Sequence, residues 1–268
     1  MTLRTGPLLL GLALLMLLLL CALAPGWVAP YDPLAFDYDA LLMPPSWGHL
    51  FGTDQFGRDM LSRTIFASVV DLQIAVFATV GPLLAGSLVG LMVGYFGGIA
   101  DIVFGRLVDL VVTFPFIVLV IATVAILGPG LINMYIAISC LNWVFYGRLM
   151  RAEVRVQCGH DYVAAARVLG FGTRRIMFRH VLPNAVRPVL VYLVTDMALA
   201  ILLGSSLGYL GLGAQPPTAE WGVLIADGKN FFTQAPWISL FPGVAIVLCG
   251  LGFSLTGDGL AELMQVRR

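Results

Sequence analysis

Long apolar stretches separated by short polar ones make up most of this chain. A membrane-spanning helix needs about 20 mostly apolar residues, and several stretches with almost no charged residue reach that length. They cover residues 7–24, 72–100, 110–147, 189–209 and 238–256. The third stretch is long enough for two helices, and Gly128-Pro129-Gly130 supplies a break between them. The pattern therefore predicts an all-α polytopic membrane protein with about six transmembrane helices.

These stretches predict a single transmembrane domain with both chain ends on one side. The expected segments are a first span (1–24), an external loop (25–70), spans two to four (71–147), a cytoplasmic loop (148–188), span five (189–209), an external loop (210–237), span six (238–257) and a cytoplasmic tail (258–268).

Composition and charge support this layout. The chain is 59% hydrophobic and 11% charged, whereas about a quarter of the residues in a soluble domain are charged. The 15 basic and 15 acidic residues cancel, so only their distribution is informative. Twelve of the 15 basic residues fall on the side of the N-terminus: Arg4, Arg106, eight arginines between positions 148 and 187, Arg267 and Arg268. Since cytoplasmic loops are enriched in Lys and Arg, both termini are expected in the cytoplasm.

The first apolar stretch has a second interpretation. A short basic start, an apolar core and Ala22-Leu23-Ala24 fit the loose pattern of a cleaved signal peptide. We favour an uncleaved first helix, because the apolar core is long and five further spans follow it.

The basic loop is predicted to contain two short helices. Asp161 can cap a first helix, and Gly170 suits the left-handed position that ends it. Thr173 can cap a second helix, and Pro183 is expected to stop it. Ala164, Ala165 and Ala166 would allow another backbone to come close, while Arg174, Arg175 and Arg179 lie on the second helix. The loop is therefore predicted to dock a protein, with binding of lipid headgroups by its arginines as the alternative.

This loop resembles the ATPase-docking loop of the inner-membrane permease subunits of bacterial ABC importers. Their EAA motif reads Glu-Ala-Ala, three residues, Gly, nine residues, Ile, one residue, Leu-Pro. Ala165, Ala166, Gly170, Leu182 and Pro183 stand at matching positions. Two positions depart from the motif, because Ala164 replaces the glutamate and His180 replaces the isoleucine.

Four segments resemble more narrowly the C-type permease subunit of the dipeptide, oligopeptide and nickel branch. They are residues 52–63 (GTDQFGRDMLSR), the loop segments YVAAARVLG from Tyr162 and RHVLPN to Asn184, residues 209–222, and residues 236–260 with their Pro-Trp, Pro-Gly and Thr-Gly-Asp-Gly-Leu motifs. Together they extend over nearly the whole chain in the expected order. A further departure is Gly204, where this branch often has a glutamate.

The resemblance implies a type I ABC importer transmembrane domain in a bacterial inner membrane, transporting peptides or a related small solute such as a nickel chelate. It also implies a heterodimer with a homologous B-type permease, two cytoplasmic ATPase subunits and an external solute-binding protein. ATP and magnesium would bind the ATPase subunits and no cofactor would bind this chain, since its only lysine, Lys229, is followed by Asn230 and cannot complete a P-loop.

Other patterns favour packing over chemistry. Gly86, Gly90 and Gly94 have the small-residue spacing of close helix contacts, although this face could also meet the partner permease. Residues 204–208 fit GxSxG, but the three histidines lie in loops. No His, Cys and Asp cluster has the spacing of a metal site, and the basic loop is a poor nucleic-acid site because its first arginines extend span four toward lipid headgroups.

Two further segments are ambiguous. Asp196 lies about two turns into span five, and an acid inside a span is a candidate for the pathway or for ion coupling in a secondary transporter. We prefer the ABC permease, since Asp196 is a single acid and no internal repeat is visible. In the first external loop, Asp59 can cap the following helix, and the segment is interpreted as an interfacial turn into span two.

Overall fold

The computed structural model describes residues 5–264, so Arg4, Arg267 and Arg268 lie outside the described range. Within it the chain forms helices and loops, with one isolated β-bridge between Thr53 and Asp59. The helices are α1 (Thr5–Leu23), α2 (Pro25–Val28), α3 (Met60–Phe77), α4 (Val80–Phe96), α5 (Gly98–Thr113), α6 (Phe116–Leu127), α7 (Leu131–Cys158), α8 (Asp161–Val168), α9 (Thr173–Arg175), the π-helix η1 (Ile176–Val181), α10 (Leu182–Tyr209), α11 (Trp221–Gly228), the 3-10 helix η2 (Lys229–Phe231) and α12 (Trp237–Leu263). The predicted all-α fold is confirmed.

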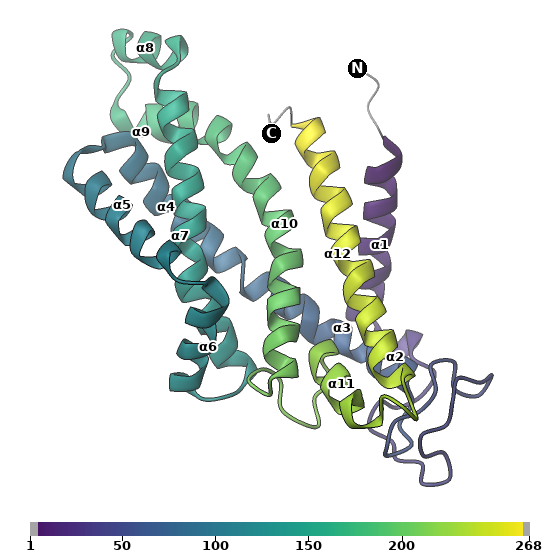
Figure 1. Cartoon of the computed structure of the whole chain (residues 1–268). Helices are drawn as coiled ribbons and strands as arrows, with labels where there is room; N and C mark the ends of the chain where they lie inside the picture. The colour runs from purple at the N-terminus through teal and green to yellow at the C-terminus, as the bar shows by residue number, and fades with distance from the viewer. Residues whose placement is uncertain (1–4, 265–268) are drawn as a thin grey trace.

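Six helical passes can be followed through the described chain. Four satisfy the length and composition of a membrane span: Gly6–Leu23, Met60–Phe96, Thr173–Tyr209 and Trp237–Leu263. A fifth is the pair α5 and α6, which is bent by 88° between the two helices. The sixth is α7, which is 28 residues long and packs against both α4 and α10. α7 does not satisfy the combined length and composition of a membrane span, so that measure supports four or five of the six predicted spans in the described chain. In Figure 1, α1 and α12 lie side by side and α10 separates them from α7.

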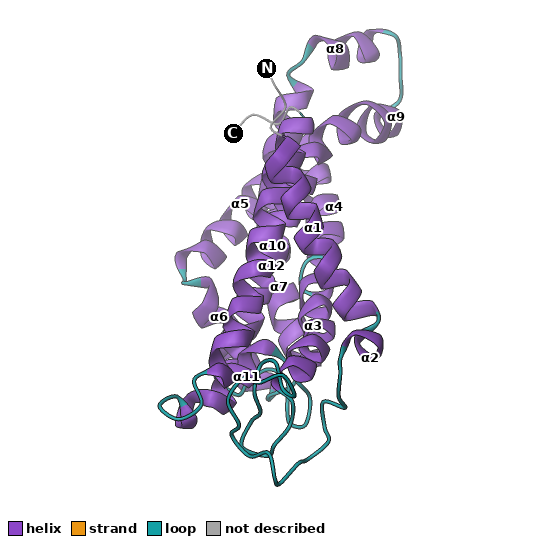
Figure 2. Cartoon of the chain, turned by 90° about the vertical axis from the view of Figure 1, so that its right-hand side faces the viewer, coloured by secondary structure: helices purple, strands orange, loops and turns teal. Residues whose placement is uncertain are grey.

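The molecule has two different ends. At one end α8 and α9 project beyond the helices, on the same side as the start of α1 and the end of α12 (Figure 1). At the other end lie α11 and the long loop between α2 and α3, which Figure 2 shows as a cluster of turns beneath the helices. The arrangement places the two predicted loop types at opposite ends.

Proline and glycine account for the main breaks in the helices. Pro115 lies between α5 and α6, where the chain bends, and a proline inside a helix removes a backbone hydrogen bond. Gly128 and Gly130 have φ angles of 92° and 138° between α6 and α7, a region of φ that glycine adopts without steric cost. The predicted break within residues 110–147 is therefore confirmed.

Gly86, Gly90 and Gly94 form the contact between α4 and α7. A Cβ atom added at Gly86 would lie 2.2 Å from the carbonyl oxygen of Trp143, and one at Gly90 would lie 2.4 Å from that of Gly147. The two backbones thus approach closely only because side chains are missing. Since α7 of the same chain covers this glycine face, it is not free to meet a partner permease.

Two helices start earlier than the apolar stretches suggested. α3 begins at Met60 and contains Asp71, and α10 begins at Leu182 and places Asp196 near its middle. The expectation that Asp196 is close to the end of its span, and the only acid within one, is therefore wrong. Asp71 and Arg187 bound the charge-free stretches in the sequence, but helix continues across both positions, and Asp71 and Asp196 are buried and hydrogen-bonded inside the helices.

Candidate functional site

The predicted coupling loop consists of the end of α7, α8, α9, η1 and the start of α10, and it projects from the molecule (Figure 2). Gly170 has a φ of 75° and follows the end of α8 as predicted. Two predicted caps are wrong, because His160 and Gly172 occupy the cap positions and no side chain caps either helix. Asp161 and Thr173 are instead the first residues of their helices.

Pro183 does not stop a helix. It lies in the first turn of α10, directly after η1, and Leu182 begins that helix. A proline within a helix removes one backbone hydrogen bond, and Pro183 lies at the point where the π-helix changes to the α-helix. The loop therefore continues into α10 without a break in the helix, so a movement of the loop would also displace α10.

α8 has one buried and one exposed face. Val163 and Ala166 are buried, whereas Ala164 and Ala165 are exposed. Beyond them the exposed face ends in Val168 and Leu169, whose side chains are 89% and 70% exposed. We call these four exposed residues (Ala164, Ala165, Val168 and Leu169) the apolar tip. Only two of the three predicted alanines are available to another protein.

The buried face of α8 belongs to a hydrophobic core shared with the membrane helices. Val163 and Ala166 pack in one cluster with Ile176, Met177 and Val181 of η1, Leu91 of α4, Tyr146, Met150 and Val154 of α7, and Ala185 and Val189 of α10. Close-packed cores of this kind transmit displacement because they cannot deform continuously. The coupling loop is thus attached to three of the six passes.

Polar contacts hold α8 against the π-helix. The hydroxyl of Tyr162 donates to Gln157 Oε1 over 2.8 Å and lies 3.4 Å from the carbonyl oxygen of His180. That same carbonyl oxygen accepts from Asn184 Nδ2 over 3.0 Å. Burial raises the pKa of Tyr162, so its hydroxyl stays protonated and able to donate. Short π-helices are frequent at functional sites.

The three arginines of the second loop helix are exposed, and one of them also stacks on an aromatic ring. Arg174, Arg175 and Arg179 are all exposed, but the Arg175 guanidinium lies 4.0 Å from the ring centroid of Phe171. The His180 ring also stacks against Phe171, with ring centroids 5.7 Å apart, and its Nε2 is buried without a hydrogen-bond partner in the described part of the chain. Where the EAA motif has isoleucine, this chain therefore has an aromatic stack.

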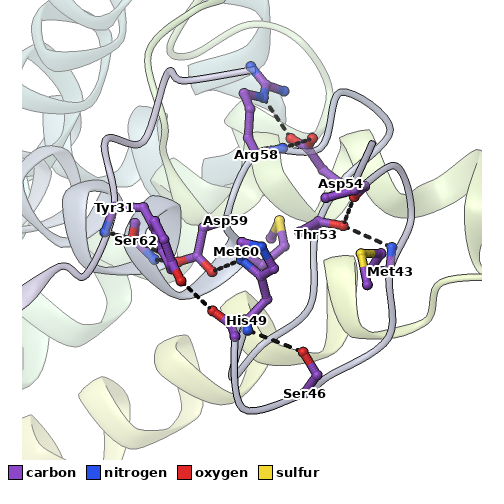
Figure 3. Close-up of polar contacts among 12 residues, drawn as sticks. Tyr31, Met43, Ser46, His49, Thr53, Asp54, Arg58, Asp59, Met60 and Ser62 are labelled. Carbon is purple, nitrogen blue, oxygen red and sulfur yellow. Dashed lines mark hydrogen bonds and ion pairs between the residues drawn. The ribbon is translucent and has the colours of Figure 1, made fainter. Parts of the chain in front are cut away.

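At the opposite end, residues 52–63 form a buried ion network, which Figure 3 shows around Asp54 and Asp59. Asp54 is fully buried and pairs with Arg58 Nε over 2.7 Å and with Arg63, which also lies 3.6 Å from Asp227 of α11. We call these four residues the external ion network. Asp59 caps α3 as predicted, accepting from the Ser62 N–H over 2.7 Å.

This end is also fixed to α12. Trp237 Nε1 donates to the carbonyl oxygen of Thr53 over 3.0 Å, and the Phe51 and Phe241 rings stack with centroids 3.9 Å apart. The segment that the sequence predicted to be an interfacial turn is therefore packed into the core of the protein. Alternating charges at positions 54, 58, 59 and 63, directly before an apolar helix, were the sequence signal for it.

The sequence did not predict that two acidic residues, Asp71 and Glu220, lie near each other. Asp71 accepts from Ser205 Oγ (3.2 Å) and from the N–H of Trp221 (3.1 Å), the residue that directly follows Glu220. Glu220 caps α11 through the N–H groups of Gly222 and Val223. Burial raises the pKa of Glu220, with these hydrogen bonds opposing the rise. The pair joins α3, α10 and α11, and only their packing brings the two acids together.

Asp196 faces a groove on the side of the molecule. The groove has a volume of about 430 Å³ and is formed by α6, α7 and α10. Asp196 Oδ2 accepts from Asn142 Nδ2 and from the Tyr146 hydroxyl, each over 2.7 Å. In the GxSxG segment, the Ser206 hydroxyl donates to the Leu202 carbonyl oxygen of its own helix (2.7 Å). Among residues 5–264 no group of three or more His, Cys, Asp or Glu side chains is placed to hold a metal ion.

Comparison with known proteins identifies the class to which this arrangement belongs. Residues 86–268 match the family described as binding-protein-dependent transport system inner membrane component. The chain belongs to this family, and it is a multi-pass membrane protein of the ABC importer permease class, with the type I transmembrane domain that the resemblance implied.

Individual relatives are similar over nearly the full chain. The di/tripeptide transport system permease protein DppC of Pseudomonas aeruginosa (strain UCBPP-PA14) is 43% identical, covering 95% of this chain and 86% of the relative. The dipeptide transport system permease protein DppC of Escherichia coli (strain K12) is 41% identical, covering 95% and 87%. The probable D,D-dipeptide transport system permease protein DdpC of Escherichia coli (strain K12) is 38% identical, covering 94% and 85%. The predicted kinship with the C-type peptide permeases is confirmed.

Proposed function

We propose that this chain is a translocation-pathway subunit of an ATP-driven importer of short peptides. It would form a heterodimer with a homologous B-type permease. Two cytoplasmic ATPase subunits and an external solute-binding protein would complete the transporter. The relatives named as peptide transport permeases support the substrate class. The skewed distribution of arginines supports a bacterial inner-membrane orientation with both termini in the cytoplasm.

The observation that carries this proposal is the shape of α8. Its apolar tip is exposed at the far end of the molecule, while its opposite face is buried against α4, α7 and α10. An exposed apolar patch next to arginines is typical of a protein contact. Closure of the ATPase subunits would pull on α8, and the shared core would pass this movement to the helices.

The chain would have no catalytic role in this assembly. ATP and Mg²⁺ would bind the ATPase subunits, since Lys229 precedes Asn230 and lies beside α11 at the external end. The chain would contribute the coupling loop and part of the path, and the solute-binding protein would select the solute. Nucleic acid has no place in this assembly.

Reconstitution tests the proposal. The four membrane and ATPase polypeptides of one transport system are placed in proteoliposomes with the loaded binding protein, and uptake of labelled L-alanyl-L-alanine is measured. We expect uptake to require ATP and both ATPase subunits. Charge reversal at Arg174 and Arg175, or enlargement of Ala165→Leu, is expected to abolish uptake while the membrane helices stay assembled.

Uptake that continues without any ATPase subunit would overturn the proposal and support the secondary transporter. Retention of ATPase binding after all three changes would favour a lipid-facing role for the loop. A matched control is Lys229→Glu, which reverses a charge at the opposite end of the molecule.

A further inference from the structure

The groove beside Asp196 has the composition of a cation-binding site within the membrane helices. Asp196 lies 14 residues after Leu182 and 13 residues before Tyr209, the two ends of α10. At a rise of 1.5 Å per residue, about 20 Å of helix extends on either side. A carboxylate at this depth is unfavourable unless polar groups or a cation compensate it.

The protein itself supplies only part of that compensation. Asn142 and Tyr146 lie one turn apart on α7, and both donate to the same oxygen, Oδ2. Asn142 Nδ2 is held in turn 3.3 Å from the carbonyl oxygen of Ala78. Within residues 5–264 no basic side chain pairs with Asp196 and no donor reaches its Oδ1. One oxygen of a fixed, 5% exposed carboxylate is left for a further partner.

The walls of the groove suit an ammonium group carried on an apolar body. Phe116, Phe145 and Tyr192 present aromatic rings to the groove, and Leu199 and Leu203 present aliphatic side chains. Aromatic faces attract cations, most strongly where water is excluded. Among the described residues that line the groove, Asp196 is the only charged one, so a bound cation would be held next to its carboxylate.

We infer that Asp196 and this groove form a subsite for the primary ammonium group of a solute in transit, the end that a short unmodified peptide carries. This inference rests on the proposed function. Two hydrogen bonds to Oδ2 would orient the carboxylate, and the ammonium group would donate to Oδ1. Asp196 lies in the middle third of α10, where an alternating path must hold its solute between the two sides.

The test uses the complete transporter in proteoliposomes, with saturating binding protein loaded with L-alanyl-L-alanine so that delivery is not limiting. Asp196→Asn keeps the shape of the side chain and removes its charge. We expect dipeptide uptake to fall by about tenfold or more, the effect of losing a hydrogen bond to a charged group. ATP hydrolysis stimulated by the binding protein should stay close to that of the parent, because the substitution keeps the shape of the side chain and lies outside the coupling loop. Thr195→Ala, at the exposed neighbouring position that does not line the groove, is the matched control and should transport normally.

A second variant keeps the inference testable if Asp196→Asn folds poorly. Leu199 is about half exposed in the groove wall, so Leu199→Lys should fold. The ammonium group of the introduced side chain should pair with the Asp196 carboxylate and block uptake. Leu199→Gln is its uncharged control, and uptake by Leu199→Lys should be clearly lower than uptake by Leu199→Gln.

Three results would overturn the inference. The first is unchanged uptake by Asp196→Asn, and the second is equal uptake by Leu199→Lys and Leu199→Gln. The third is loss of assembly with the second permease in Asp196→Asn, because the acid would then pair with a cation of that subunit. Failure of the proposed function would look different, since the parent complex itself would show no ATP-dependent uptake.

Discussion

The two ends of this protein differ in whether their arginines are buried and paired or exposed. At the end predicted to be external, Arg58 and Arg63 are almost fully buried, and Asp54 and Asp227 neutralise them within the chain. In the predicted coupling loop, Arg174 and Arg175 are exposed, as is the apolar tip. The charges of the first end are therefore compensated within the chain, whereas the loop leaves charged and apolar surface exposed. Changes at the first end should affect stability, and changes at the second should affect coupling.

The largest expected effect is at Asp54. Asp54→Ala would leave Arg58 buried without its counter-charge and Arg63 with only the more distant Asp227, and breaking a buried pair in this way destabilises proteins by about 3–5 kcal/mol. We expect a strong loss of folded protein, measured as the yield and thermal unfolding temperature of the purified complex. Asp39→Ala, an exposed acid on the same loop, should leave both unchanged. Equal stability of the two variants would contradict the view that this end is held by the external ion network.

The next largest effect should be a loss of binding without a loss of stability. Val168→Asp with Leu169→Asp places two charges on the apolar tip. If these residues are central to the ATPase contact, their loss should weaken it by about 2 kcal/mol or more, or roughly thirtyfold. The affinity of the detergent-solubilised permease pair for the ATPase subunits measures this.

Leu50→Asp, at an exposed position of the external loop, is the control for that double change. It should not alter ATPase affinity. A double variant that binds ATPase normally would show that the apolar tip is not the contact.

A smaller effect is expected at Tyr162. Tyr162→Phe removes the hydroxyl that joins α8 to Gln157 and lies near the His180 carbonyl oxygen, a contact worth about 0.5–1.5 kcal/mol. We expect ATPase binding to persist and the number of peptides imported per ATP hydrolysed to fall. Tyr38→Phe, an exposed tyrosine of the external loop, should not change this ratio. A lower ATPase affinity in Tyr162→Phe would place the residue in the contact itself.

The smallest effect should come from one exposed charge. Arg174→Gln removes a single exposed cation, and exposed ion pairs contribute about 0.2–1 kcal/mol. The loss of ATPase affinity should therefore be modest and should shrink as salt screens the charge. Affinity measured at low and high salt checks this. An effect that does not change with salt would mean that Arg174 acts through packing.

Local signals predicted the parts of the fold that depend on the chain nearby. The break after Leu127, the glycine after α8 and the Asp59 cap all follow from backbone conformations that one or two residues favour. The caps at Asp161 and Thr173 failed because a polar residue at a helix start can occupy either of two neighbouring positions. The prediction for Pro183 failed for a different reason, since the helix changes from π to α just before this proline and continues through it.

The candidate sites depended on contacts between distant segments. Asp71 and Glu220 are 149 positions apart, and no spacing in the sequence indicates that α3 and α11 bring them into contact. The depth of Asp196 was also misjudged, because the continuation of helix through η1 depends on packing against α4 and α7. The buried side of α8 could be expected from its pattern only after its neighbours were known.

By itself the sequence determined the positions of the long apolar stretches, the charge difference between the two ends and the motif of the coupling loop, because membrane insertion and local backbone preference act on consecutive residues. The tertiary structure alone decided which face of α8 is exposed, which charges are neutralised within the chain and where Asp196 lies. These features arise from the packing of helices far apart in the chain, and burial sets the free energy of every charge among them.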